Sequence, residues 1–114
     1  MVVTFETEIM MIEASLARKI PLKVAVQAIA MCRKCDPHFE PRRNGSTERW
    51  HITDTSSNYV FELVVTDQRW FDVREGKGGG GAIDLVMHLK SCSFKTALEM
   101  LAPVMAKKSP ELRG

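Results

Sequence analysis

The chain has 114 residues, of which 45 % are hydrophobic and 26 % are charged, and its formal net charge is +2. These values are ordinary for one globular domain whose core needs no disulfide or metal to hold it together. No apolar run reaches the roughly 18 residues of a membrane-spanning helix, and the first residues lack the order of a signal peptide. We therefore expect a cytoplasmic protein whose three cysteines remain reduced.

The first 31 residues carry the spacing of two helices. Ile9, Ile12 and Leu16 recur at helical intervals and predict an amphipathic helix that ends near residue 18. Pro21 interrupts this pattern and suits the first position of a second helix, which we expect to extend to about Met31. Together the two segments predict an N-terminal helical hairpin.

Residues 32–47 lose this periodicity, and their prolines and Asn-Gly pair are turn signals, so we expect a loop. Cys32, Cys35 and His38 lie in this loop and are residue types that bind zinc, but a structural zinc site usually has four ligands. The other soft ligands are spread along the chain without forming a close pair: His51, His88 and Cys92. We therefore expect no metal, with Cys32, Cys35 and His38 as the only candidate ligands. A redox role for the cysteines also lacks the expected order of strand, motif and helix.

Three segments after the loop have the composition and alternation of half-buried strands, namely residues 50–53, 59–65 and 70–73. They are rich in Val, Trp, Tyr and Phe, and short polar turns separate them. We expect them to pair as a three-stranded antiparallel sheet.

A glycine-rich segment at residues 76–81 follows the third strand. Such a run has no side chains to block approach, and at a helix start it would present free amide N–H groups to an anion. Gly76, Gly78 and Gly81 also fit the spacing of dinucleotide sites, but no second parallel strand follows, which disfavours nucleotide binding. The run is therefore either a contact for nucleic-acid phosphates or a purely structural turn.

Two helices are expected after the glycines. Residues 83–89 are apolar almost all round, as in a buried helix. Ser93 is a suitable N-cap for a last helix with one apolar face, and Pro103 is expected to limit that helix. The charged tail, residues 107–114, is expected to fray.

Cations and aromatic residues are interleaved along the strands and the glycine run. Cations can contact phosphates and flat rings can stack on bases, which is the combination that single-strand binders use. Alternatively, the rings belong to the core and the charges to a solvated surface. Because one side of each strand faces the core, only some of the rings can be exposed. The candidate nucleic-acid-binding residues are Arg49, Trp50, Tyr59, Arg69, Trp70, Arg74, Lys77, Gly78 and Gly79.

The segment W-F-D-V-R-E-G-K-G-G-G-G-A-I-D-L-V-M-H-L, residues 70–89, resembles the closing segment of a domain of bacterial DNA primases. That domain is their zinc-ribbon-like (CHC2-type) N-terminal domain. The segment is most similar to the metal-free variants that accompany toprim modules in plasmid, phage and mobile-element proteins. The likeness extends more loosely over residues 43–101. Where the family has its two ligand pairs, this chain reads T-D-T-S-S-N and D-V-R-E-G-K, without cysteine or histidine.

The residues and the resemblance together predict an α+β fold. A three-stranded antiparallel sheet of the zinc-ribbon type, with its metal replaced by hydrophobic packing, would be covered by the C-terminal helices. The single domain would comprise helices at 1–31, a loop at 32–47, the primase-like core at 48–106 and a tail at 107–114.

The resemblance implies a non-catalytic module that binds DNA, preferably single-stranded. It would assist a primase, polymerase or helicase of a mobile element in replication, priming or conjugation, without a cofactor. No nucleophile with a recognisable histidine and acid is present, and no carboxylates are paired at metal spacing, so we expect no enzyme activity. The alternative is a protein-interaction or inhibitory subunit that docks a partner through its N-terminal helices.

Overall fold

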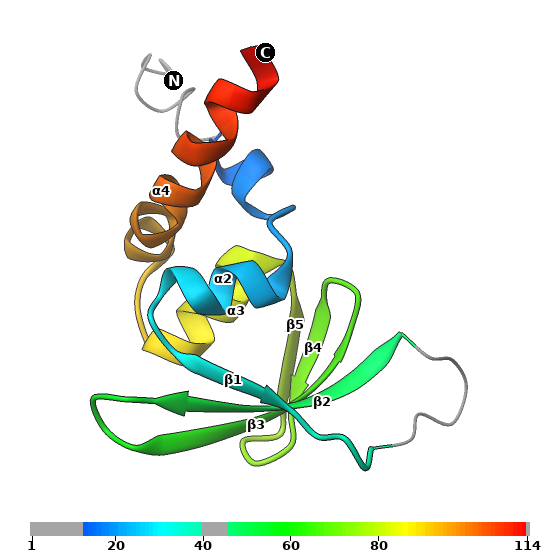
Figure 1. Ribbon diagram of the computed structural model, residues 1–114. Helices are drawn as coiled ribbons and strands as arrows, with labels where there is room; N and C mark the ends of the chain where they lie inside the picture. The colour runs from blue at the N-terminus through cyan, green and yellow to red at the C-terminus, as the bar shows by residue number, and fades with distance from the viewer. Residues whose placement is uncertain (1–12, 40–45, 114) are drawn as a thin grey trace, which may run out of the picture.

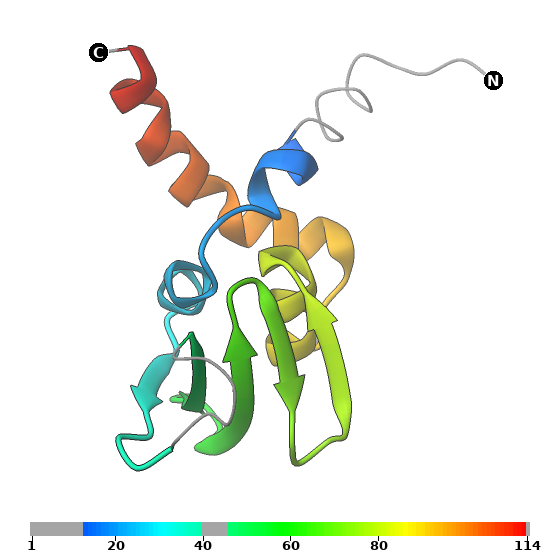
Figure 2. The same cartoon turned by 90° about the vertical axis from the view of Figure 1, so that its right-hand side faces the viewer.

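The computed structural model describes residues 13–39 and 46–113. After a helical turn at residues 13–17, its elements are, in chain order, α2 (Leu22–Ala28), β1 (Cys32–Cys35), β2 (Thr47–Asp54), β3 (Tyr59–Thr66), β4 (Arg69–Asp72), β5 (Lys77–Gly80), α3 (Ala82–Lys90) and α4 (Phe94–Arg113). Figure 1 shows the helices gathered on one side of the sheet. Figure 2 shows α4 extending away from the sheet toward the C-terminus.

The strands form one antiparallel sheet in the order β1-β2-β3-β4-β5, so each strand pairs with the next one along the chain. The strands expected at residues 50–53, 59–65 and 70–73 are present as β2, β3 and β4. The expectation of a three-stranded sheet is nevertheless wrong, because β1 and β5 extend it at its two edges. The fold is an α+β arrangement around a five-stranded sheet.

Both additional strands lack the side-chain pattern that marks a strand. Strand β1 is Cys-Arg-Lys-Cys and lies inside the segment expected to be a loop, yet it pairs with β2 over all four of its residues. Strand β5 is Lys-Gly-Gly-Gly, and glycine is depleted in strands, yet it pairs with β4 in the same way. In each case the backbone of a well-formed neighbouring strand supplies the pairing groups.

The core lies between the sheet and the helices. Trp50 and Ile52 of β2 and Leu63 of β3 point toward the helices and are buried. The helices contribute a matching apolar face, including Val26 of α2 and Leu85 of α3. Among residues 13–39 and 46–113, the opposite face of the sheet has no covering layer.

The helices agree only partly with the sequence. The second helix of the expected hairpin is α2, whereas the first is described only from residue 13. The turn pair at residues 44–45 lies outside the described residues. Helix α4 continues through Pro103 to Arg113, so the expected limit at this proline is wrong. None of the helices in the described part of the chain has the length and apolar character needed to cross a membrane.

Candidate nucleic-acid interface

The uncovered face of the sheet, called here the open face, carries the residues that alternate with the core. On β2 these include Arg49 and His51, and the register places Val64 of β3 and Phe71 of β4 on the same face. Arg69 precedes Phe71 by two residues and is exposed. The open face therefore combines cations with apolar surface.

A groove of about 760 Å³ runs along the β5 side of this face. Phe71 stands beside it with 45 % of its surface exposed, which is a large fraction for an aromatic residue in a strand. The groove is lined by Val64, Thr66, Arg69, Trp70, Phe71, Gly78, Gly79 and Gly80. It exists because the two β5 residues that face it, Gly78 and Gly80, have no side chains to fill it.

The surroundings of Gly78, Gly79 and Gly80 differ in how much space they leave for a side chain. A Cβ on Gly78 would lie 3.0 Å from Phe71 Cδ1 and 3.1 Å from the Trp70 carbonyl oxygen, so the Phe71 ring occupies that space. A Cβ on Gly79, on the other side of the strand, would collide with the Asp84 carboxylate and lie 2.8 Å from Trp70 Cζ2. At Gly80 the nearest atom would be the Gln68 carbonyl oxygen at 3.6 Å, which is an ordinary contact. Packing thus requires glycine at the first two positions and leaves Gly80 unexplained.

The backbone amides at the end of the glycine run are engaged within the protein. Gly80 N donates to Asp84 Oδ2 at 3.0 Å, and Gly81 N donates to the Gln68 carbonyl oxygen at 2.7 Å. Residues 77–80 form a strand instead of a loop ahead of the helix. The expected row of free amides for a phosphate is therefore wrong, because β5 pairs with β4 and Asp84 takes up the next N–H group.

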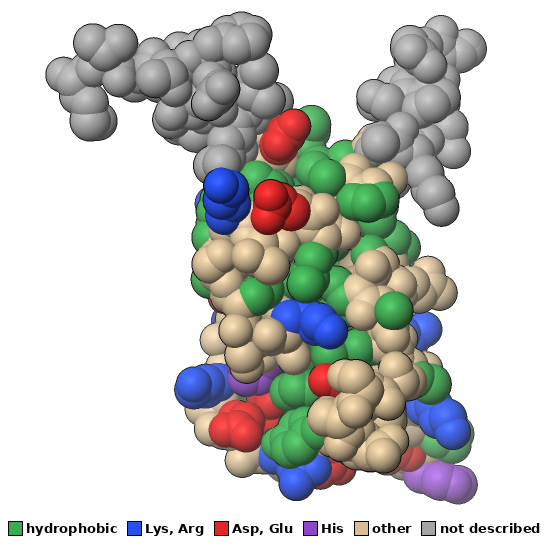
Figure 3. Space-filling view, turned by 90° about the vertical axis from the view of Figure 1, so that its left-hand side faces the viewer, with side chains coloured by type: hydrophobic (Ala, Val, Ile, Leu, Met, Phe, Trp, Pro, Cys, Tyr) green, Lys and Arg blue, Asp and Glu red, His purple; other side chains and the backbone are tan. Residues whose placement is uncertain are grey.

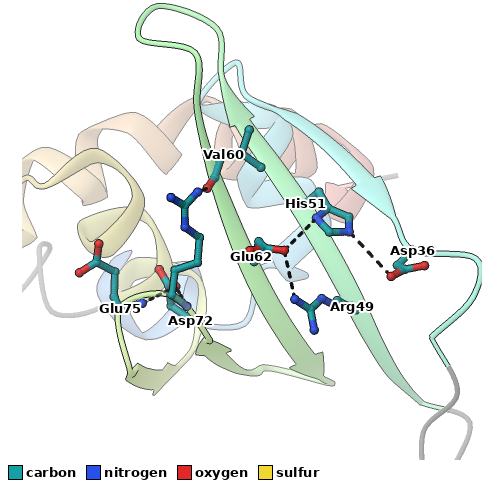
Figure 4. A network of polar contacts seen from close by, with 8 residues as sticks. Asp36, Arg49, His51, Val60, Glu62, Asp72 and Glu75 are labelled. Atoms are coloured by element: carbon teal, nitrogen blue, oxygen red, sulfur yellow. Dashed lines mark hydrogen bonds and ion pairs between the residues drawn. The ribbon is translucent and has the colours of Figure 1, made fainter.

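A polar network occupies the centre of the open face (Figure 4). Glu62 of β3 accepts a hydrogen bond from Arg49 at 3.1 Å and lies 3.6 Å from His51 Nδ1. His51 Nε2 also lies 3.9 Å from Asp36. Arg49 is thus partly neutralised, whereas Arg69 has no ion-pair partner among the described residues.

Both tryptophans of the candidate set are in the core. Trp50 is 4 % exposed and Trp70 is 5 % exposed, so neither ring is available for stacking on a base at the open face. Trp50 donates from its indole nitrogen to Glu48 at 3.0 Å, and the Arg33 guanidinium lies over its ring. Their flat rings are the reason for proposing them from the sequence, but the alternation along each strand turns them toward the core.

Tyr59 and Arg74 contact each other at the far end of the β3–β4 pair. The Arg74 guanidinium lies 4.8 Å from the centre of the Tyr59 ring. It also donates a hydrogen bond to the Val60 carbonyl oxygen at 2.7 Å, which Figure 4 marks at Val60. Partial removal from water raises the pKa of the Tyr59 hydroxyl above its ordinary value. The phenol therefore stays neutral at physiological pH and adds no negative charge beside Arg74.

The structure brings only part of the candidate set together. Arg49, Arg69 and Gly78 lie on the open face, whereas the register places Lys77 and Gly79 on the opposite face, toward the helices. Phe71 was missed, although the same alternation that buries Trp70 predicts that its neighbour points outward.

The candidate zinc ligands do not converge. Cys32 pairs with Thr53 and Cys35 pairs with Trp50, so the two cysteines lie on opposite faces of β1. Both are exposed, and so is His38. Within residues 13–39 and 46–113, no group of three or more His, Cys, Asp or Glu side chains could hold a metal ion.

Comparison with known proteins finds no matching protein family and no matching solved structure. The chain is similar to a protein of Zymomonas mobilis subsp. mobilis described as "65 kDa protein". The two are 30 % identical over 90 residues, which cover 79 % of this chain and 13 % of that protein. The chain thus corresponds to a small part of that relative's length.

Proposed function

We propose that this protein is a non-catalytic module that binds single-stranded DNA on the open face of its sheet. The observation that carries the proposal is the exposed Phe71 ring beside a groove that the β5 glycines leave empty. A flat exposed ring stacks on any base, and each stacked base contributes roughly 1–3 kcal/mol. A single strand offers such unpaired bases, whereas the bases of a duplex are already stacked.

The charges of the open face suit a phosphate backbone that follows the groove. Arg69 lies in the groove wall and is exposed, and Lys34 of β1 shares the face through its pairing with His51. Arg49 adds a third cation, although its bond to Glu62 reduces its effect. Such contacts position a strand without reading its sequence.

The biological setting follows from the primase resemblance. The module would work in the cytoplasm, with a primase, polymerase or helicase of a mobile element, during replication, priming or conjugation. That the related segment of the Zymomonas protein belongs to a longer chain supports a role beside other activities.

A protein-docking function is the second candidate, and the side of the molecule with the helices favours it. Figure 3 shows hydrophobic side chains interspersed with polar and charged ones on one flank of the molecule. Leu16, in the helical turn before α2, is 55 % exposed. Exposed apolar surface of this kind is a feature of protein interfaces.

Binding of single-stranded and duplex oligonucleotides across a salt series tests the proposal. We expect tighter binding to the single strand, with an affinity that falls as salt rises because bound phosphates release counterions. Equal affinity for both forms, or no binding at low salt, would contradict the proposed function and favour protein docking.

A further inference from the structure

A second cavity lies on the other side of β5. This cleft has a volume of about 620 Å³ and lies between β5, the β4–β5 turn and the C-terminal part of α3. Its lining includes Trp70 and Gly78, which also line the groove on the open face. The two cavities therefore adjoin across an edge strand that has almost no side chains.

The inner wall of the cleft is made of rings in edge-on and tilted contact, next to a buried carboxylate. His88 packs against Trp70 with ring centres 4.8 Å apart and meets Phe61 at 6.0 Å. Its Nε2 is 2.7 Å from Oδ2 of Asp72, a residue with no exposed surface. The other Asp72 oxygen accepts the amides of Arg74 and Glu75, so the carboxylate has fixed partners on both sides.

The contact with Asp72 determines which nitrogen of the His88 ring donates a hydrogen bond and which can accept one. An ionised Asp72 only accepts hydrogen bonds, so Nε2 carries the hydrogen and Nδ1 is free to accept when the ring is neutral. The indole nitrogen of Trp70 is buried and has no acceptor among the described residues. The wall thus combines an aromatic surface with an acceptor, His88 Nδ1, that the described residues leave unused.

The rim of the cleft has the opposite charge from the open face. Glu75 and Asp84 contribute two carboxylates against one cation, Lys77. Phosphate groups are repelled from such a rim, whereas an uncharged ring with polar edges is not. A nucleobase has these properties, because its edge carries donors and acceptors and its face can stack.

We propose that the cleft holds one base of the DNA strand, which turns over the β5 edge while its phosphates remain on the open face. This inference rests on the proposed function. It assigns His88, Trp70 and Phe61 as the stacking wall and Asp72 as the residue that positions His88.

Protection of Cys92 from alkylation tests this assignment in the unmodified protein. Cys92 lines the cleft, whereas Cys35 is exposed on the face of β1 opposite the open face and serves as an internal control. Trypsin places these cysteines on different peptides, since Lys34 and Lys90 precede them, so mass spectrometry follows each thiol separately. The probes are an oligothymidylate and an oligomer of the same length that consists of abasic sites.

With oligothymidylate at about ten times its dissociation constant, occupancy of the cleft should slow alkylation of Cys92 about tenfold and leave Cys35 unchanged. The abasic oligomer, which offers phosphates without bases, should not protect Cys92. Oligothymidylate that binds without protecting Cys92 would overturn the cleft assignment alone. Absence of any oligonucleotide binding would overturn the proposed function and this inference together.

Discussion

Gly80 is the residue at which structural and functional reasons for glycine can be separated. Its backbone is outside the left-handed region, and an added Cβ would meet nothing closer than 3.6 Å. The register places that Cβ on the open face, in the groove beside Phe71. A glycine that the fold does not require suggests that something must approach the backbone closely.

We expect Gly80→Ala to weaken single-strand binding severalfold while stability stays unchanged or rises by about 0.4–1 kcal/mol, because alanine restricts the unfolded chain. Gly79→Ala is the matched control. Its Cβ would collide with Asp84 and crowd Trp70, so it should lower stability by about 1–3 kcal/mol. Urea unfolding and an oligonucleotide titration measure both effects. Unchanged binding by folded Gly80→Ala protein would show that the groove is not occupied.

Asp54 provides a test of the local geometry at the β2–β3 turn. The hydroxyl of Ser56 donates to Asp54 at 2.7 Å and its amide donates at 3.0 Å, and these bonds lower the pKa of the carboxyl. A lowered folded-state pKa stabilises the protein above the unfolded pKa, and this contribution is lost as pH falls through the folded value. Ser56→Ala should move the pKa of Asp54 back toward its ordinary value, as an NMR titration would show. No movement would mean that the hydroxyl bond is absent in solution.

At the scale of elements, the Asp72–His88 pair joins the end of β4 to helix α3. Removing His88 leaves one oxygen of the buried Asp72 carboxylate without its hydrogen-bond partner. We therefore expect His88→Ala to destabilise the fold by about 1–3 kcal/mol in urea unfolding.

His51→Ala is the comparison for this prediction, because His51 interacts with its carboxylates at the surface and should contribute no more than about 1 kcal/mol. If the two variants lose equal stability, the hydrogen bond between His88 and the buried Asp72 carboxylate contributes no more to stability than a surface contact.

The extended backbone of β1 determines whether its two cysteines can bind one metal ion. Three residues of a strand separate Cys32 from Cys35 by about 10 Å and turn their side chains to opposite faces, which prevents them from chelating one ion. Treatment with a chelator should therefore leave the thermal unfolding temperature unchanged. Stoichiometric zinc with unfolding on chelation would contradict the placement of this strand.

Periodicity predicted the elements whose side chains pack. Strands β2 and β3 and helix α3 were expected close to their observed positions, because their apolar residues recur at the intervals that burial imposes. Strands β1 and β5 could not be predicted in this way, since Cys-Arg-Lys-Cys and Lys-Gly-Gly-Gly are held by backbone pairing. Helix α4 continues past Pro103, where the sequence predicted its end.

The candidate site was predictable to a similar extent. Arg69 and Gly78 were identified from composition, and Phe71 could have been identified from the alternation that buries Trp70. The Asp72–His88 contact joins residues 16 positions apart in different elements, and only the fold brings them together.

At the scale of the whole molecule, the sheet and the helices present two different surfaces. The open face has cations, an exposed ring and an empty groove, whereas the other side carries apolar side chains, with Leu16 exposed. The central claim is that the open face binds single-stranded DNA. A substitution on each surface therefore separates this function from protein docking.

The most direct measurement compares the single-strand affinities of Phe71→Ala and Leu16→Ala with that of the unmodified protein, at one fixed salt concentration. Both residues are substantially exposed, so both variants should fold, which circular dichroism and thermal unfolding can check. We expect Phe71→Ala to weaken binding by about 5- to 150-fold, the equivalent of one lost base stack, and Leu16→Ala to leave it unchanged. Equal affinity of folded Phe71→Ala and unmodified protein would contradict the claim that the open face is the binding surface.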